Sequence, residues 1–199
     1  MSKKSTKKIV VGLGIICIVL LIIFLNREEI LNSTPTLTIE TPQKISASES
    51  KEFTLDVKVS TFGEAIYPAT SMSISFDAAR LEFLGVEDGN VFIRNDEEQV
   101  PAKLPEWSCN PEHCNETGKI NIIYLDTTGG KNAFSKNLLG ESDNVILRLN
   151  FRLRGSARKG DVCDLIFDDA VFAASNEKES LAMTRDTLKV RNGKIVIGE

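Results

Sequence analysis

Apolar and polar residues alternate one by one along several stretches of this 199-residue chain. Residues 53–60, 71–76 and 145–154 carry the pattern most fully. In an extended strand, successive side chains point to opposite faces, so a period of two gives each strand one apolar face and one polar face. Each of these stretches therefore predicts a strand with one buried side and one open side.

Shorter apolar runs occupy residues 81–86, 91–94, 119–125, 162–167, 170–173, 187–190 and 194–197. Turn residues separate the runs, among them Asn192-Gly193, which we expect to form a two-residue hairpin between the last two strands. No long helical pattern appears after residue 25. So many short strands in one domain predict an all-β fold, either an antiparallel sandwich or a barrel.

The start of the chain has a different composition. Four lysines lie within residues 1–8, and residues 9–25 hold no charged side chain. A helix of this length rises about 25 Å, slightly less than the ~30 Å hydrocarbon core of a membrane. We predict a cytoplasmic basic tail at 1–8, a transmembrane signal-anchor helix at 9–25, a stalk at 26–35 and one extracellular domain at 36–199. A cleaved signal peptide is the alternative, and it would also export the domain.

The charge balance limits the partners of the exported part. After the four N-terminal lysines, 20 basic residues face 28 acidic residues, a net charge of −8. Nucleic acids and anionic membrane surfaces are themselves negative, so this balance argues against both as partners of the domain. Residues 9–25 remain the predicted contact with the membrane.

Two cysteines flank a short polar stretch. Cys109 and Cys114 enclose His113, which is the only histidine in the chain. In an exported protein this spacing predicts a disulfide between Cys109 and Cys114. Three ligands in one loop, without a second Cys or His pair, fall short of a structural zinc site, so we expect no metal.

Catalytic residues are scarce. A Ser-His or Cys-His mechanism would depend on His113, inside the loop that we expect to be cross-linked. Asp168 and Asp169 are adjacent in an expected strand, where neighbouring side chains point to opposite faces and do not converge as a glycosidase pair would. We therefore expect no enzyme and no cofactor. Asn115-Glu116-Thr117 matches the N-glycosylation pattern.

Three segments, in order along the chain, resemble cohesin domains, the receptor modules of cellulosome scaffolds. They are residues 71–89 (SMSISFDAARLEFLGVEDG), residues 120–129 (INIIYLDTTG) leading to 144–151 (NVILRLNF), and residues 165–176 (LIFDDAVFAASN) with the closing NGKIVI. The resemblance implies a nine-stranded antiparallel jelly-roll sandwich. It also implies a partner, a dockerin, which is a small calcium-binding helical module on another protein. The calcium would belong to that partner.

The resemblance and the alternation together predict a docking face. If Met72, Ile74 and Phe76 point into the core, the serines between them lie on the open face. Ile123 shares that face in the register that the family implies, and the alternative is that Ile122 and Tyr124 point outward instead. The predicted partner-binding residues are Ser71, Ser73, Ser75, Asn121, Ile123, Asp126 and Gly129. Many cohesins carry an Asn and an Asp near the start of this strand, where this chain has Ala69 and Ser71.

Two other functions stay open at this point. Some carbohydrate-binding modules share the jelly-roll architecture, and a polysaccharide is their ligand. A flat glycan site needs a row of exposed aromatic rings, but Trp107, Tyr67 and Tyr124 are scattered along the sequence. A structural envelope protein is the other alternative. We expect a cell-surface binding module linked to polysaccharide degradation.

Overall fold

A computed structural model describes residues 34–42, 44–47, 52–91, 107–140, 143–175 and 181–198. Residues from Pro35 onward form one compact unit. The predicted basic tail, the signal-anchor and all of the stalk up to residue 33 lie outside the described residues. Within the described ranges, no helix has the length and apolar character needed to cross a membrane.

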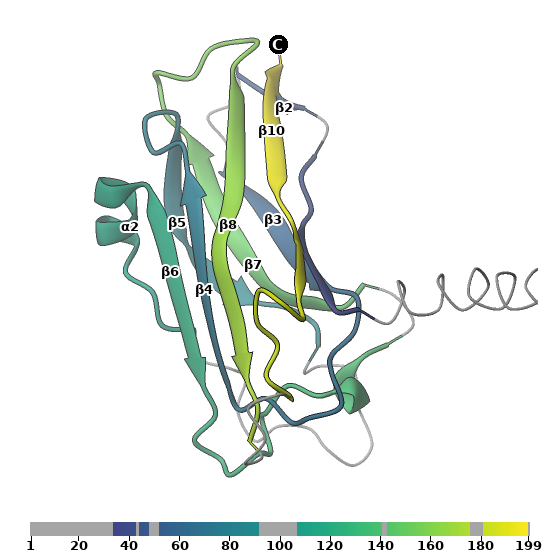
Figure 1. Cartoon of the computed structure of the whole chain (residues 1–199). Helices are drawn as coiled ribbons and strands as arrows, with labels where there is room; N and C mark the ends of the chain where they lie inside the picture. The colour runs from purple at the N-terminus through teal and green to yellow at the C-terminus, as the bar shows by residue number, and fades with distance from the viewer. Residues whose placement is uncertain are drawn as a thin grey trace, which may run out of the picture. The chain divides into compact units, whose positions relative to one another are not determined.

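Ten strands of the described part form two five-stranded sheets (Figure 1). One sheet has the order β5 (Leu81–Asp88), β7 (Val145–Leu153), β3 (Glu52–Val59), β1 (Thr36–Ile39) and β9 (Lys189–Arg191). The other has the order β2 (Ile45–Ser46), β10 (Gly193–Gly198), β8 (Val162–Ala173), β4 (Ala69–Phe76) and β6 (Lys119–Leu125). A short helix, α2 (Pro111–Thr117), and a 3-10 turn, η1 (Lys136–Leu138), complete the described elements.

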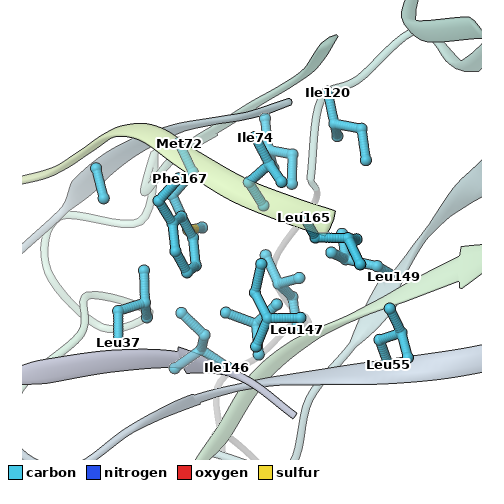
Figure 2. Packing of buried hydrophobic residues seen from close by; sticks show 14 of the residues in the cluster. Leu37, Leu55, Met72, Ile74, Ile120, Ile146, Leu147, Leu149, Leu165 and Phe167 are labelled. Atoms are coloured by element: carbon cyan, nitrogen blue, oxygen red, sulfur yellow. The ribbon is translucent and has the colours of Figure 1, made fainter. Parts of the chain in front are cut away.

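The core confirms the prediction of a sandwich. Side chains that alternate with polar neighbours on β3, β4, β7 and β8 are buried, and Figure 2 shows them packed between the two sheets. Leu55, Leu147 and Leu149 come from the first sheet, and Ile74 and Leu165 come from the second. Each of these five side chains is at most 1% exposed. Burial of such apolar side chains is the main stabilising contribution that the period-two pattern provides.

Two pairings are parallel where an antiparallel fold was expected. β1 pairs with β9, and β10 pairs with β2, in parallel; every other pairing between named strands is antiparallel. Both parallel pairings involve strands from the two ends of the domain. The C-terminal strands therefore close both sheets against the first strands of the sequence.

The expected hairpin at Asn192-Gly193 is wrong. β9 and β10 follow each other in sequence but belong to different sheets, so the chain crosses between the sheets at Asn192. The Asn192 Oδ1 accepts a hydrogen bond from the backbone N–H of Phe167 at 3.0 Å. Gly193 is buried, and a Cβ there would lie 2.8 Å from the Cγ2 atoms of Ile39 and Thr41. The Asn-Gly pair thus lies at a crossover between the sheets, where the close approach of Ile39 and Thr41 requires a glycine, and not in a hairpin turn.

The helix α2 was not predicted. The Asn110 side chain caps its start by accepting a hydrogen bond from the N–H of His113 at 3.3 Å, Pro111 occupies the first turn, and Gly118 ends it with φ 68°. These are ordinary helix-start and helix-stop signals. The helix packs against β5 and β6, which are the edge strands of the two sheets on one side of the sandwich. Ser108, just before it, forms an antiparallel bridge to Ile123 on β6.

Candidate functional site: the open face of β4, β6 and β8

The strand β4 has the predicted orientation. Met72, Ile74 and Phe76 are buried in the core, and the serines between them lie on the opposite, outer face of the sheet. β4 is flanked by β6 on one side and by β8 on the other. The three strands therefore present one continuous outer face, on which Ser71, Ser73 and Ser75 form the central row.

Ile123 points outward, as the docking-face prediction requires. Its side chain is 57% exposed, whereas Ile122 and Tyr124 are 1% and 3% exposed. The alternative register, in which Ile122 and Tyr124 face solvent, is therefore wrong. Ile123 lies directly opposite Ser71 in the β4–β6 register. Leu125, two residues further along β6, is 64% exposed on the same face and was missed, although the same alternation predicts it.

An apolar half of the face surrounds these two side chains. In register, Ala69 lies between Leu125 and Ala173, and Ser71 lies between Ile123 and Val171. We call this set the apolar half of the face: Ala69, Ile123, Leu125, Val171 and Ala173. Adjacent exposed apolar side chains on one side of a sheet are typical of a surface that a partner covers.

A polar half of the face continues from Ser73. The Ser73 hydroxyl donates to Asn121 Oδ1 at 2.9 Å, and the Ser75 hydroxyl donates to Asp168 Oδ2 at 2.6 Å. Lys119 Nζ lies 3.5 Å from the same Asp168 oxygen. We call this set the polar half of the face: Ser73, Ser75, Lys119, Asn121, Asp168 and Asp169. These cross-strand bonds fix the side chains before any partner arrives. Ile166, which pairs with Ser75 on β8 and is 44% exposed, is an apolar side chain at the end of this half.

A β-bulge puts two carboxylates on this face. The β4–β8 register shifts between Ser73 and Ile74, where Ser73 pairs with Asp169 and Ile74 pairs with Phe167. Asp168 is therefore the extra residue, and both it and Asp169 lie on the outer side, between the buried Phe167 and Ala170. The expectation that Asp168 and Asp169 point to opposite faces is wrong, because it assumed an uninterrupted strand.

On the outer face of the other sheet, ion pairs join charged side chains of β3, β5 and β7. Arg152 contacts both Glu52 and Glu82, and Arg148 Nε lies 3.2 Å from Asp56 Oδ1. Lys58 Nζ lies 2.7 Å from Glu40 and 3.0 Å from Asp143. Charges that are already paired across strands are typical of a solvated face. The apolar half of the β4–β6–β8 face has no counterpart there among the described side chains.

The two predicted loop residues take different places. The carboxylate of Asp126 is hydrogen-bonded within its own loop. Its Oδ1 accepts from the Thr128 backbone N–H at 2.7 Å, and its Oδ2 accepts from the Gly130 N–H at 2.6 Å. Partial burial acts to raise the pKa of this carboxyl, but these hydrogen bonds outweigh it and hold the pKa below its ordinary value. Gly129 is exposed with φ 76° and open space around it. Asp126 shapes the rim, and Gly129 lies on it.

Cys109 and Cys114 are free thiols in this structure. Cys114 is buried in α2 against the core, and Cys109 packs against the same core. Burial, followed by the proximity of Cys114, raises the pKa of the Cys109 thiol, and the backbone of Val86 acts in the opposite direction. The disulfide between them stays a prediction. In the described part of the chain, no group of three or more His, Cys, Asp or Glu side chains is placed to hold a metal ion.

The three aromatic rings that are scattered along the sequence are turned inward in the structure. Tyr67 is fully buried, Tyr124 is 3% exposed, and Trp107 packs on Tyr124 with ring centroids 5.4 Å apart. The Tyr124 hydroxyl donates to the carbonyl of Asn132. None of these three rings lies on the β4–β6–β8 face, so the described face does not offer the stacking surface that a flat glycan site needs.

A two-layer sandwich with a preformed and partly apolar sheet face defines a binding module. Residues 36–191 match the cohesin domain family, and the chain belongs to that family. The membership confirms the resemblance seen in the sequence, and with it the prediction that the domain is not an enzyme. No curated protein sequence matches the chain.

Solved structures agree on the fold. The sixth cohesin of Acetivibrio cellulolyticus scaffoldin B, in complex with a Cel5 dockerin mutant, is 20% identical with a TM-score of 0.58. The match covers 83% of this chain and 99% of that chain. The OlpA cohesin of Clostridium thermocellum, in complex with the dockerin Doc918, is 16% identical with a TM-score of 0.55. The match covers 83% of this chain and 99% of that chain. A cohesin module of a Clostridium perfringens family 33 glycoside hydrolase is 11% identical with a TM-score of 0.56. The match covers 83% of this chain and 98% of that chain.

Proposed function

We propose that the domain is a receptor module whose β4–β6–β8 face binds a dockerin on another protein. The observation that carries the proposal is the pair of exposed apolar side chains, Ile123 and Leu125, beside an ordered row of serines. Membership of the cohesin family supports it, as do the dockerins bound to two of the similar structures.

The two halves of the face suit an amphipathic partner helix. Ile123 and Leu125 are more than half exposed, and covering an apolar side chain fully contributes about 1.5–3 kcal/mol. The hydroxyls of Ser73 and Ser75 are held in place by Asn121 and Asp168. Since β-strands already fix these groups, association costs little conformational entropy on this side of the interface.

Ala69 and Ser71 stand where many cohesins carry an Asn and an Asp, but a carboxylate lies on the neighbouring strand β8. β4 carries no carboxylate on its outer face, but the bulge in β8 places Asp169 directly beside Ser73. Asp169 is exposed, and its carboxylate has no ion pair among the described residues. We propose that this carboxylate receives a basic side chain of the partner, so that the acidic contact comes from β8 rather than from β4.

We also propose that the domain lies outside the cell, is held by residues 9–25 and takes part in polysaccharide degradation through the protein that it docks. The lysine cluster before an uncharged stretch supports the orientation. Protease added to intact cells should remove the domain, and it should leave the domain untouched if the domain is intracellular. The link to polysaccharides holds if the docked protein degrades one.

Titration of the full chain with dockerin modules encoded in the same genome tests the function. We expect at least one dockerin to bind, and we expect binding to weaken when calcium is removed, because the resemblance implies a partner module that binds calcium. The domain alone should keep its circular dichroism spectrum under the same treatment. A full set of dockerins without any binder would overturn the proposal.

A further inference from the structure

A second surface feature lies where the two sheets part, on the side away from α2. It is a groove of about 370 Å³ between β8 and β9, the last strand of the other sheet. Phe167, Ala170 and Leu188 are buried and line it. Val190 also lines it and is 42% exposed. The lining of the groove therefore includes an apolar part that is open to solvent.

Backbone groups of both strands point into this groove. β10 pairs with β8 only as far as Leu165, and further along Phe172 exchanges two backbone hydrogen bonds with Met183. Because backbone direction alternates along a strand, the N–H and C=O of Ala170 point to the same side as those of Phe172. No residue of the described ranges pairs with Ala170 on that side.

The same reasoning applies to β9. The Lys189 N–H donates to the carbonyl of Pro35 at 2.9 Å, so Lys189 faces β1. Val190 therefore turns its N–H and C=O away from β1, toward the open edge of the sheet. Unpaired groups on a sheet edge are a template for an added extended segment.

The charges around the groove are mostly positive. Arg185, Lys189 and Arg191 line it and are exposed, in a domain whose overall charge is negative. In the part of the chain that the structure describes, Lys189 and Arg191 have no ion pair, whereas Lys58, Arg148 and Arg152 each have one or two. Arg185 donates to the carbonyl of Asp168 at 3.1 Å and so helps to hold the bulge.

The two carboxylates that line the groove do not cancel these cations. Asp168 accepts from Ser75 and lies near Lys119, so its charge is engaged on the sheet face. Asp169 lies at the rim on the β8 side and would repel an acidic side chain there. An acidic group is therefore favoured on the β9 side, near Lys189 and Arg191.

We propose that this groove binds an extended acidic peptide segment of a partner protein, which pairs with the edge of β9 at Val190. Apolar side chains of the segment would enter the groove over Leu188 and Phe167, and its acidic side chains would meet Lys189 and Arg191. This site is distinct in its chemistry from the β4–β6–β8 face, which it adjoins through Asp168 and Asp169.

The test uses the full chain and two short peptides, one of alternating valine and glutamate and one of alternating valine and lysine. We expect the glutamate peptide alone to bind, more weakly at high salt, and to shift the amide resonances of Val190 and Ala170. The double variant Lys189→Glu/Arg191→Glu should weaken binding about tenfold or more, since it reverses two contacting charges. Lys194→Glu, an exposed lysine on β10 away from the groove lining, is the matched control and should bind as before.

A backbone variant separates edge pairing from charge attraction. Val190→Pro removes the N–H that faces the groove and spares the Lys189 bond to β1, and proline is tolerated on an edge strand. We expect it to weaken the glutamate peptide while dockerin binding stays unchanged. Equal binding of both peptides, resonance shifts at Ile123 instead of Val190, or no loss in the charge-reversal variant would each overturn the proposal.

Discussion

The carboxamide of Asn115 pairs with the backbone of Phe83 as a neighbouring strand would. Its Oδ1 accepts from the Phe83 N–H at 2.9 Å, and its Nδ2 donates to the Phe83 carbonyl at 2.8 Å. Nδ2 also donates to the carbonyl of Pro111 at 2.8 Å, and Oδ1 also accepts from Arg154 Nη2 at 3.2 Å. All hydrogen-bonding positions of this amide are used, and the edge strand β5 is covered there.

Replacing Asn115 should therefore destabilise the domain. Asn115→Ala leaves the backbone of Phe83 without a partner at a half-buried position, and we expect the free energy of unfolding to fall by about 2 kcal/mol. Urea denaturation measures the loss. Glu116→Ala, on the exposed side of the same helix, is the control. Equal stability of the two variants would show that the amide pairing contributes nothing.

The same bonds bear on the N-glycosylation pattern at Asn115-Glu116-Thr117. Both amide hydrogens of Asn115 are donated inside the fold, so the folded domain does not offer this side chain for modification.

Gly193 should not tolerate a side chain. An added Cβ would lie 2.8 Å from the methyl carbons of Ile39 and Thr41, in the crossover between the sheets. We expect Gly193→Ala to lower the free energy of unfolding by about 1–3 kcal/mol, the usual cost of overpacking. Gly155→Ala adds the same methyl group where no atom lies within 4 Å, and denaturation curves should show little change. Similar losses in both variants would contradict the close approach.

The loop at Asp126 should depend on pH. Because its hydrogen bonds hold the folded pKa of this carboxyl below the unfolded value, the stabilisation is present at neutral pH and is lost as the pH falls through the folded pKa. We expect the wild-type chain to be more stable than Asp126→Asn at neutral pH. The difference should shrink below about pH 4, where the carboxyl begins to be protonated. A difference that stays constant down to strongly acidic pH would contradict this role.

Asp169 should control the salt dependence of partner binding. Its exposed carboxylate lies beside Ser73 at the boundary of the two halves of the face. We expect Asp169→Asn to weaken dockerin binding by about twofold to fivefold at low salt and to flatten its dependence on ionic strength. Asp164→Asn, an exposed carboxylate near the other end of β8, should leave both unchanged. Calorimetric titrations at several salt concentrations decide between these outcomes.

The orientation of the face was accessible from the sequence because alternation alone determines which side of a strand is buried. Ser71, Ser73, Ser75 and Ile123 all lie where that pattern predicts. The signs of a module that binds another protein were likewise readable in three ordered segments. Leu125 follows from the same rule as Ile123 and was overlooked.

The features that the sequence did not reveal depend on partners distant in the chain. The bulge at Asp168 exists only relative to β4, and nothing in Asp168-Asp169 itself signals it. Asn192-Gly193 has the local preference of a hairpin turn, but the pairing of β9 with β1 and of β10 with β8 overrides that preference. The helix α2 covers strand edges rather than a wide core surface, so it lacks a long apolar period despite its capping residues.

Binding by the β4–β6–β8 face is tested most directly by the affinity of a dockerin for the double variant Ser73→Arg/Ile123→Arg, measured by calorimetry. Both side chains lie on the outer face, so the variant should keep its unfolding midpoint while dockerin binding disappears. Val162→Arg introduces a matched arginine at a 42% exposed apolar position near the far end of β8 and should bind like the wild type. Unchanged affinity in the double variant would show that the partner binds elsewhere.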